Sequence, residues 1–197
     1  MNLHDKSLEV QGIFEELEVE ARQFLEKSQL QCLAGCGRCC TKPDIFATVL
    51  EFLPMALHAY QNGSAYSLLE TINNASNTDV CIIFKQMISA NDRGFCTDYR
   101  NRGLICRLFG QAARRDKNGN LELLTCKSIK EDKKDQYMQA QNAINESLPV
   151  PISSHYYQRL HNIDPSLGHE TFPINTALKK ALEMVLMYEN YRQDEAG

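Results

Sequence analysis

The sequence predicts a mainly α-helical fold in which irregular cysteine-bearing loops, and one small β-hairpin, are organised around a metal site. Three observations lead to this prediction. Apolar residues recur at helical spacing toward both ends of the chain, turn-forming residues interrupt its middle, and eight cysteines fall between residues 32 and 126. A periodic apolar face is typical of a packed helix, and clustered thiols in an intracellular chain are typical of metal binding.

The composition is that of an ordinary globular protein. Of 197 residues, 43% are hydrophobic and 23% are charged, and the formal net charge is -4. No overall positive field attracts nucleic acid, so that partner is not expected. No apolar stretch reaches the roughly 18 residues that span a bilayer, and the N-terminus lacks the apolar core of a secretion signal. We therefore expect a cytoplasmic protein without a membrane partner.

The first helices are predicted from apolar periodicity. Residues 5–29, within an N-terminal helical segment 1–31, place apolar residues on one face with glutamates and lysines between them. Residues 44–61 are strongly apolar and predict a buried helix, which Pro54 kinks or divides in two. A shorter helix is expected over 64–75. The apolar face of the first helix consists of Val10, Ile13, Phe14, Leu17, Ala21, Phe24 and Leu25.

A cysteine-cluster domain is expected over 32–130. Residues 80–84 form either a short strand or the start of a helix, because periodicity does not separate the two in so short a run. The turn-forming run 116–120, followed by apolar residues, predicts a small hairpin that ends at Cys126.

The C-terminal segment 131–197 is expected to be a helical extension packed on this domain. Residues 131–146 form a polar helix that Pro149 ends, and 153–162 form a short helix. The last helix begins at Pro173, since proline suits the first turn of a helix. Its apolar face includes Ile174, Ala177, Leu178, Ala181, Leu182 and Val185.

The first cysteines form a C-x3-C-x2-C-C pattern within nine residues. Thiolates two or three residues apart on a tight loop converge on one centre, either tetrahedral zinc or an iron–sulfur cluster. Gly35 and Gly37 allow the loop to adopt positive φ. Successive side chains on an extended backbone point in opposite directions, so one of the two adjacent cysteines is expected to face a different centre or the core. These cysteines are Cys32, Cys36, Cys39 and Cys40.

The other cysteines are dispersed along the chain. Eight thiols supply either two four-ligand centres or one centre with spare thiols. Only His58 among the histidines lies near the cysteines in sequence, so ligation by thiolates alone is expected, which favours zinc or iron–sulfur over hard cations. A disulfide framework is not expected, because the cytosol keeps thiols reduced. The dispersed cysteines are Cys81, Cys96, Cys106 and Cys126.

This order of motifs resembles the YkgJ-like cysteine-cluster family, which is described as a zinc- or iron-chelating domain with a CxxCxxCC signature. The resemblance covers about residues 32–126. It departs at Gly103, where the family usually has proline, and in the x3 spacing after the first cysteine. The motifs that carry it are CLAGCGRCC, Cys81-Ile-Ile-Phe84, Gly94-Phe-Cys96-Thr-Asp-Tyr99, Arg102-Gly-Leu-Ile-Cys106-Arg-Leu-Phe109 and Cys126.

The resemblance implies a set of ligands and a class of cofactor. The cofactor expected is an iron–sulfur cluster, of the 4Fe–4S type, or zinc. The family is related to flagellin lysine methylases that contain an iron–sulfur site. The ligands implied first are Cys36, Cys39, Cys40, Cys96, Cys106 and Cys126, with Cys32 and Cys81 after them.

Three functions follow as hypotheses. The first is a cytoplasmic metal-binding protein with an electron-transfer or oxidoreductase role. The second is a structural zinc protein without catalysis. The third, by analogy with the flagellin methylases, is a protein-modifying methyltransferase-like enzyme, although the sequence has no fingerprint for S-adenosylmethionine. The sequence identifies no protein partner or substrate.

Arginines are frequent around the later cysteines. Guanidinium groups stabilise thiolates, so Arg102 and Arg107, which bracket Cys106, are predicted to surround the metal site. Tyr99 is predicted to donate a hydrogen bond to a thiolate sulfur. A solvated surface and an anionic substrate are the alternative explanations for the arginines; few aromatic residues lie between them, which disfavours nucleic acid. The arginines are Arg93, Arg100, Arg102, Arg107, Arg114 and Arg115.

Overall fold

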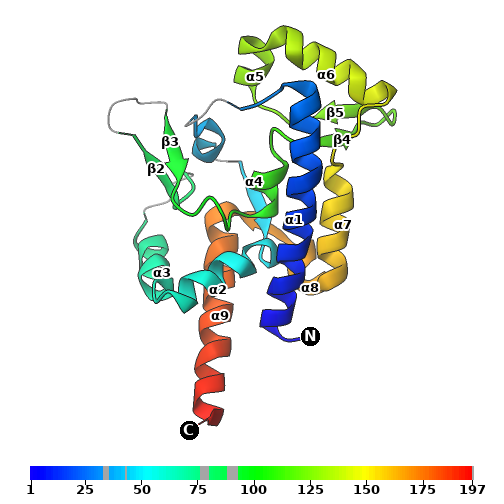
Figure 1. The fold of residues 1–197 in the computed structure, drawn as a ribbon. Coiled ribbons are helices and arrows are strands. Elements are labelled where there is room, and N and C mark those ends of the chain that lie inside the picture. The colour runs from blue at the N-terminus through cyan, green and yellow to red at the C-terminus, as the bar shows by residue number, and fades with distance from the viewer. Residues whose placement is uncertain (33–35, 43, 76–79, 88–92, 197) are drawn as a thin grey trace.

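The computed structural model describes residues 1–32, 36–42, 44–75, 80–87 and 93–196, with only the backbone given for 193–196. Helices dominate this part of the chain, which confirms the mainly α prediction (Figure 1). None of the described helices combines the length and apolar character needed to cross a bilayer. The helices are α1 (Leu3–Ser28), α2 (Leu53–Gln61), α3 (Ala65–Asn74), α4 (Leu104–Leu108), α5 (Lys127–Asp132), α6 (Lys134–Glu146), α7 (Ser153–Ile163), α8 (Pro165–His169) and α9 (Ile174–Ala196).

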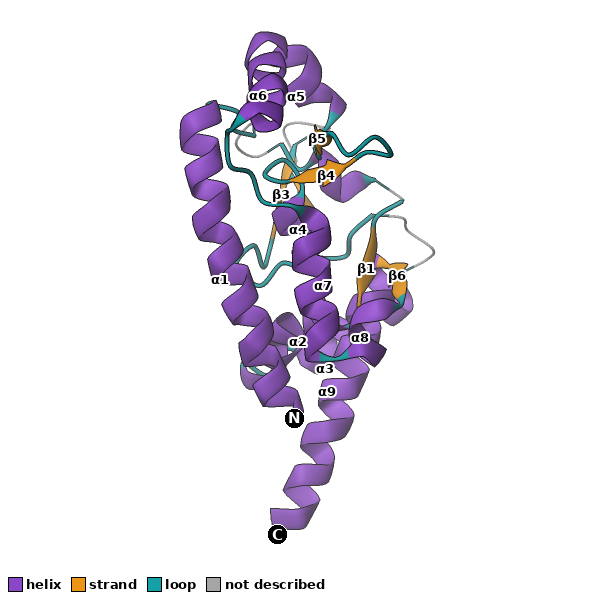
Figure 2. Ribbon diagram, turned by 90° about the vertical axis from the view of Figure 1, so that its right-hand side faces the viewer, coloured by secondary structure: helices purple, strands orange, loops and turns teal. Residues whose placement is uncertain are grey.

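Helix α1 confirms the prediction for 5–29 and begins two residues earlier. Asn2 caps its N-terminus, because the side-chain Oδ1 accepts a hydrogen bond of 2.9 Å from the backbone N–H of Asp5. The helix ends at Gln29, which has a left-handed φ of 55°. The apolar face of α1 packs on α2 and α7, and the helix runs along one side of the molecule (Figure 2).

The single helix predicted for 44–61 is wrong. Its first part is strand β1 (Phe46–Thr48), which pairs in antiparallel fashion with β6 (Thr171–Pro173). A 3-10 turn, η2 (Leu50–Phe52), follows and leads into α2. Pro54 lies in the first turn of α2, where a missing N–H costs nothing, so it starts the helix rather than kinking it. The strand forms by pairing with β6. Because that partner lies far along the chain, local sequence pattern did not reveal the strand.

Two local hairpins are described, one more than predicted. Strands β4 (Ala113–Arg115) and β5 (Leu121–Leu123) confirm the hairpin expected around 116–120. This hairpin stops short of Cys126, which caps α5 instead. The second hairpin consists of β2 (Phe84–Gln86) and β3 (Gly94–Cys96). Its strand β2 begins at the last residue of the stretch 80–84, whose structure the sequence left open.

The C-terminal third is helical, as predicted, and contributes to the main core. The polar helix expected over 131–146 is interrupted at Lys133, which separates α5 from α6. Helix α9 packs on α2 and α3, and α8 was not predicted. Buried residues such as Leu17, Leu53 and Leu182 share one core, so the segments 1–31, 32–130 and 131–197 pack together. A smaller core beneath α5 and α6 contains Phe24, Leu30, Ala113, Leu123, Ile129, Ala140 and Ile144.

Asp164 links α1 to the start of α8. Its Oδ2 accepts a hydrogen bond of 2.6 Å from Lys6 on α1, and its Oδ1 accepts from the backbone N–H groups of Ser166 and Leu167 at the start of α8. Partial burial raises the pKa of Asp164, but these hydrogen bonds outweigh it and hold the pKa at about 2. The ionised carboxylate therefore stabilises the folded state.

We expect Asp164→Asn to reduce the free energy of unfolding at pH 7 by on the order of 1 kcal/mol. Because the folded pKa of Asp164 lies below its unfolded value, this stabilisation is present above about pH 4 and disappears as the pH falls toward 2. Urea unfolding across a pH series measures the difference. Asp132→Asn, at an exposed position on α5, is the control. If the difference in free energy of unfolding between Asp164→Asn and wild type stayed constant over this pH range, the stabilising role of the Asp164 carboxylate would be contradicted.

Candidate metal centre

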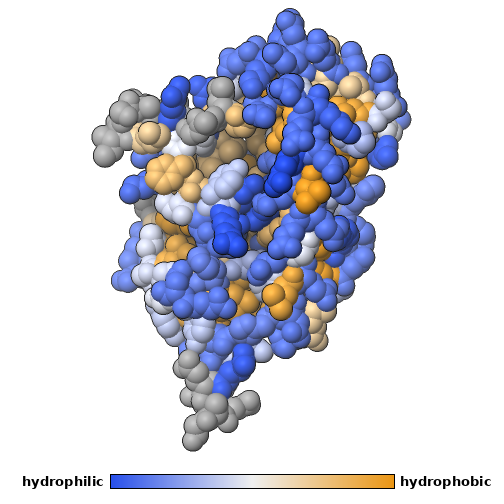
Figure 3. Space-filling model, in the orientation of Figure 1, coloured by the Kyte–Doolittle hydropathy of each residue, from blue (hydrophilic) through white to orange (hydrophobic). Residues whose placement is uncertain are grey.

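All eight predicted cysteines line one cavity of about 480 Å³. They reach it from separate parts of the chain: the segment 32–40, the turn at Cys81, strand β3, helix α4 and the N-cap of α5. None forms a disulfide. Figure 3 shows a hollow with an apolar floor between the β2–β3 hairpin and the upper half of α1. Apolar residues complete the wall, among them Ile83, Phe84, Ile105, Phe109 and Ile174.

The loop around Cys36 has the backbone freedom that the sequence predicts. Gly37 adopts a left-handed φ of 61°, whereas Gly35 lies outside the described residues. A Cβ at Gly37 would overlap the ring of Phe84 and lie 3.0 Å from the carbonyl oxygen of Gly94. A Cβ at Gly94 would overlap the same ring. The cysteine loop and the β2–β3 hairpin therefore meet only because both positions are glycine.

Both adjacent cysteines line the cavity, and Cys40 also packs against the main core, which was one of the two predicted positions. Cys39 and Cys40 lie in a 3-10 turn, η1 (Arg38–Thr41), and not in the extended backbone that would send their side chains in opposite directions. Their sulfur atoms are 4.0 Å apart, and both side chains line the cavity. The carbonyl oxygen of Cys40 also accepts a hydrogen bond of 3.1 Å from the N–H of Cys81, which fixes that turn beside η1.

Burial favours the protonated form of three of the thiols, those of Cys81, Cys96 and Cys106. Desolvation raises the pKa of Cys81 to about 11 and raises the pKa values of Cys96 and Cys106. Between the adjacent cysteines, the thiol hydrogen bond lowers the pKa of Cys39 to about 6 and raises that of Cys40. Binding of a metal cation at these thiols would therefore release protons.

The thiols surround the cavity without meeting at one point. Among the described residues, no three Cys, His, Asp or Glu side chains gather closely enough to hold a single ion. The chemistry of the donor set nevertheless suits a soft metal, since every predicted ligand is a thiol and the wall between them is apolar. The thiols are thus spread around the wall of a hollow and are not gathered at a preformed single-ion site.

Tyr99 and Arg102, two of the residues predicted to surround the site, line the cavity. The Arg102 guanidinium lies 3.8 Å from the centroid of the Tyr99 ring and donates a hydrogen bond of 2.8 Å to the Tyr99 carbonyl oxygen. Its positive charge favours the thiolate of Cys96. Within the described residues, no hydrogen bond joins the Tyr99 hydroxyl to a thiol, and the residue is 62% exposed.

Arg107, predicted to lie beside the metal site, does not line the cavity. Its guanidinium forms an ion pair with Glu18 on α1, donates to the carbonyl oxygen of Arg102 at 3.0 Å, and lies 4.4 Å from the centroid of the Phe14 ring. The charge of Arg107 still interacts with Cys106, its neighbour on α4. Arg107 therefore fastens the cysteine-bearing helix to α1.

Glu51, which the sequence did not single out, is a fully buried carboxylate that positions α4. Its Oε1 accepts hydrogen bonds from the backbone N–H and hydroxyl of Thr48, at 2.7 and 3.1 Å. Its Oε2 accepts from the N–H of Ile105 at 2.7 Å. Desolvation raises the pKa of Glu51 to about 7 against the opposing effect of these hydrogen bonds. The T-x-x-E spacing of a capping box was the sequence signal that would have found it.

Gly103, where the sequence departs from the motif that it resembles, has a φ of −62°, a value that proline also adopts. A Cβ at this position would lie 2.9 Å from Glu51 Oε2 and 3.1 Å from the ring of Phe52. The buried carboxylate thus occupies the space that a larger residue at 103 would need.

Glu51→Gln keeps the shape of the side chain but turns an amide NH₂ toward a backbone N–H, that of either Ile105 or Thr48. We expect it to lower the free energy of unfolding by roughly 1–3 kcal/mol, because a buried donor loses its acceptor. Urea unfolding at pH 8, where the wild-type carboxyl is ionised, measures this loss. The matched control is Glu15→Gln on the exposed surface of α1, for which a change below about 0.5 kcal/mol is expected. Equal stability of the two variants would contradict the role of Glu51.

Comparison of the chain with protein-family models, with curated proteins and with solved structures gives no match. The resemblance to the YkgJ-like family therefore remains an expectation from the cysteine motifs.

Proposed function

We propose that the cavity holds a metal centre bound by cysteine thiolates, that this centre is an iron–sulfur cluster, and that the protein transfers electrons in the cytoplasm. One observation carries the proposal: all eight cysteines, from segments far apart in sequence, line a single cavity. An isolated cysteine is commonly a small buried apolar residue, but that explanation does not account for their convergence. The cytoplasm is the compartment that keeps such thiols reduced.

The spread of the thiols favours a cluster over a single zinc ion. Zinc binds sulfur at about 2.3 Å, which requires four sulfurs within roughly 4 Å of one another. Cys39 and Cys40 meet that spacing, but the described residues contain no compact group of three donors. An iron–sulfur cluster is larger and is held at its corners by separate thiolates. A cavity of about 480 Å³ with thiols around its wall is suited to that kind of ligand.

Four thiols form the best candidate ligand set. Charges on Cys39, Cys81, Cys96 and Cys106 interact in every pairing, and each residue comes from a different element. Cys40 lies against Cys39, while Cys32, Cys36 and Cys126 line the rest of the cavity. When bound there, the cluster would supply a one-electron redox centre. Arg102, beside Cys96, would help to balance its negative charge.

The protein purified without oxygen is expected to be brown, with broad absorbance near roughly 400 nm and with iron and acid-labile sulfide in matched amounts. Cys81→Ser and Cys106→Ser should each lower the content of both, because each removes a cluster ligand. Cys32→Ser is the control and should retain the colour. A colourless protein with stoichiometric zinc would support the structural zinc alternative, and a protein without metal would overturn both assignments.

Cys126 provides a separate test of the ligand set. Its sulfur accepts a hydrogen bond of 3.4 Å from the N–H of Ile129 and caps α5. Serine is a better helix cap than cysteine, so Cys126→Ser should keep both the metal content and the free energy of unfolding. Cys126→Ala should lower the free energy of unfolding by about 0.5–1 kcal/mol. Metal analysis measures the first quantity and urea unfolding the second. Loss of metal in Cys126→Ser would show that Cys126 is a ligand and that the four-thiol assignment is wrong.

A further inference from the structure

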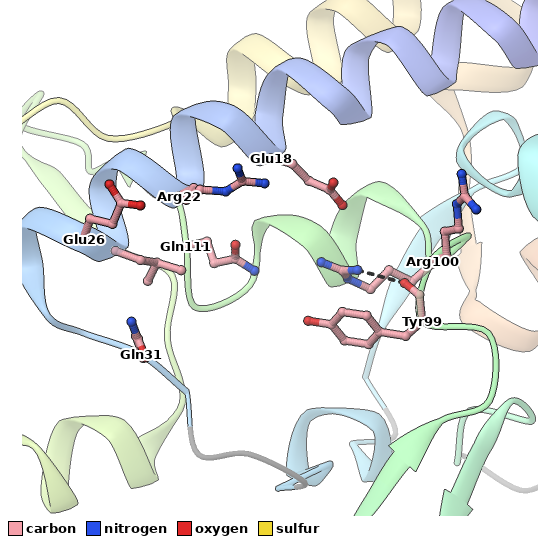
Figure 4. Close-up of a pocket in the computed structure, with 9 residues that line it drawn as sticks. Glu18, Arg22, Glu26, Gln31, Tyr99, Arg100 and Gln111 are labelled. Atoms are coloured by element: carbon pink, nitrogen blue, oxygen red, sulfur yellow. Dashed lines mark hydrogen bonds between the residues drawn. The ribbon is translucent and has the colours of Figure 1, made fainter.

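A second cavity, an open groove of about 690 Å³, lies beside the cysteine cavity. Helix α1 forms one side, and the segment around Tyr99 forms the other (Figure 4). Tyr99, Arg102 and Gln111 line both cavities, so the groove adjoins the proposed metal centre through these side chains. Glu18, Arg22, Leu25, Glu26, Gln31 and Arg100 complete the groove.

The groove carries an excess of positive charge. Arg22, Arg100 and Arg102 face it or form its rim, against Glu18 and Glu26. Glu18 is neutralised by its ion pair with Arg107, which lies behind the groove. Glu26 is therefore the acidic residue left to balance Arg22 and Arg102. Among the described residues no ion pair joins the Arg22 side chain to an acidic group, whereas the Arg100 side chain extends away from the groove in Figure 4.

The guanidinium of Arg102 is preorganised for binding an oxyanion. The residue is 8% exposed, and its guanidinium is fixed by stacking on the Tyr99 ring and by the hydrogen bond to the Tyr99 carbonyl oxygen. A planar guanidinium whose orientation is already fixed loses little entropy when it binds a carboxylate or phosphate. Figure 4 shows the Arg22 guanidinium lying along α1 on the side of Glu18, and the amide of Gln111 directed toward the open space between α1 and Tyr99. This amide adds a neutral hydrogen-bond donor to the charged ones.

We propose that this groove binds a small organic molecule through a carboxylate or phosphate group, with Arg22 and Arg102 as the anchoring residues. The apolar side chain of Leu25 and the exposed face of Tyr99 accommodate the uncharged part of such a molecule. The position of the groove places the ligand next to the cysteine cavity, as a substrate or redox partner of the centre would be placed. Arg22 lines the groove and not the cysteine cavity, so binding of an oxyanion can be measured in protein that holds no metal. The excess of arginines disfavours a basic peptide.

The test is a thermal-unfolding titration of the purified protein with inorganic phosphate and, separately, with citrate, each against sodium chloride at the same ionic strength. A ligand that binds the folded state raises Tm in a saturable way. If the rise in Tm saturates at a lower concentration of phosphate than of citrate, the ligand is assigned as a phosphate compound. If it saturates at a lower concentration of citrate, the ligand is assigned as a carboxylate. No rise above the chloride control with either probe would overturn the proposal.

Three charge variants locate the binding. Arg22→Gln should weaken the apparent affinity by about fivefold, the range of an exposed charge pair, and Glu26→Gln should strengthen it by up to the same factor. Arg115→Gln, on the exposed strand β4 outside the groove, is the matched control and should leave the affinity unchanged. An equal change in apparent affinity in all three variants would show that the oxyanion does not bind in the groove. Iron, zinc and sulfide are measured on every preparation, so a protein that binds phosphate without metal would refute the metal centre and keep the groove.

Discussion

The buried carboxylate of Glu51 is the interaction on which the arrangement of the cavity depends. One of its oxygens accepts hydrogen bonds from Thr48 at the end of β1, and the other accepts from the N–H of Ile105 at the start of α4. A helix of five residues is too short to be stable alone, so α4 takes its position from what holds its ends. Arg107 fastens the same helix to α1, which leaves Cys106 on the inner side. The position of α4, and with it one wall of the cavity, is thus set by Glu51 and Arg107.

The parts of the fold that depend on local pattern were predictable from the sequence. Helix α1 and the β4–β5 hairpin follow from apolar periodicity and from a strong turn signal, which act over a few neighbouring residues. The stretch 44–61 was not predictable in the same way. Strand β1 exists because β6 lies beside it, and the two are more than a hundred residues apart in sequence. Apolar composition alone did not distinguish that strand from a helix.

The site shows the same division between local and distant information. The cysteine pattern identified every thiol that lines the cavity, because residue type and spacing carry that information. The pattern did not show how Cys39 and Cys40 point, since that depends on the 3-10 turn. It also misplaced Arg107, whose partners Phe14 and Glu18 lie on a helix about ninety residues earlier. Proximity to a cysteine in sequence was a poor guide to proximity in space.

The contact between the cysteine loop and the β2–β3 hairpin has a consequence for how relatives of this chain can differ from it. Gly37, Gly94 and Phe84 share one small volume, and the ring occupies the space that a Cβ at either glycine would need. A smaller residue at 84 would not make room at either position. A Cβ at 94 would still lie 2.6 Å from the backbone carbonyl oxygen of Lys85, and Gly37 has a left-handed φ of 61°. Relatives that keep this contact are therefore expected to keep both glycines, whatever residue they carry at 84.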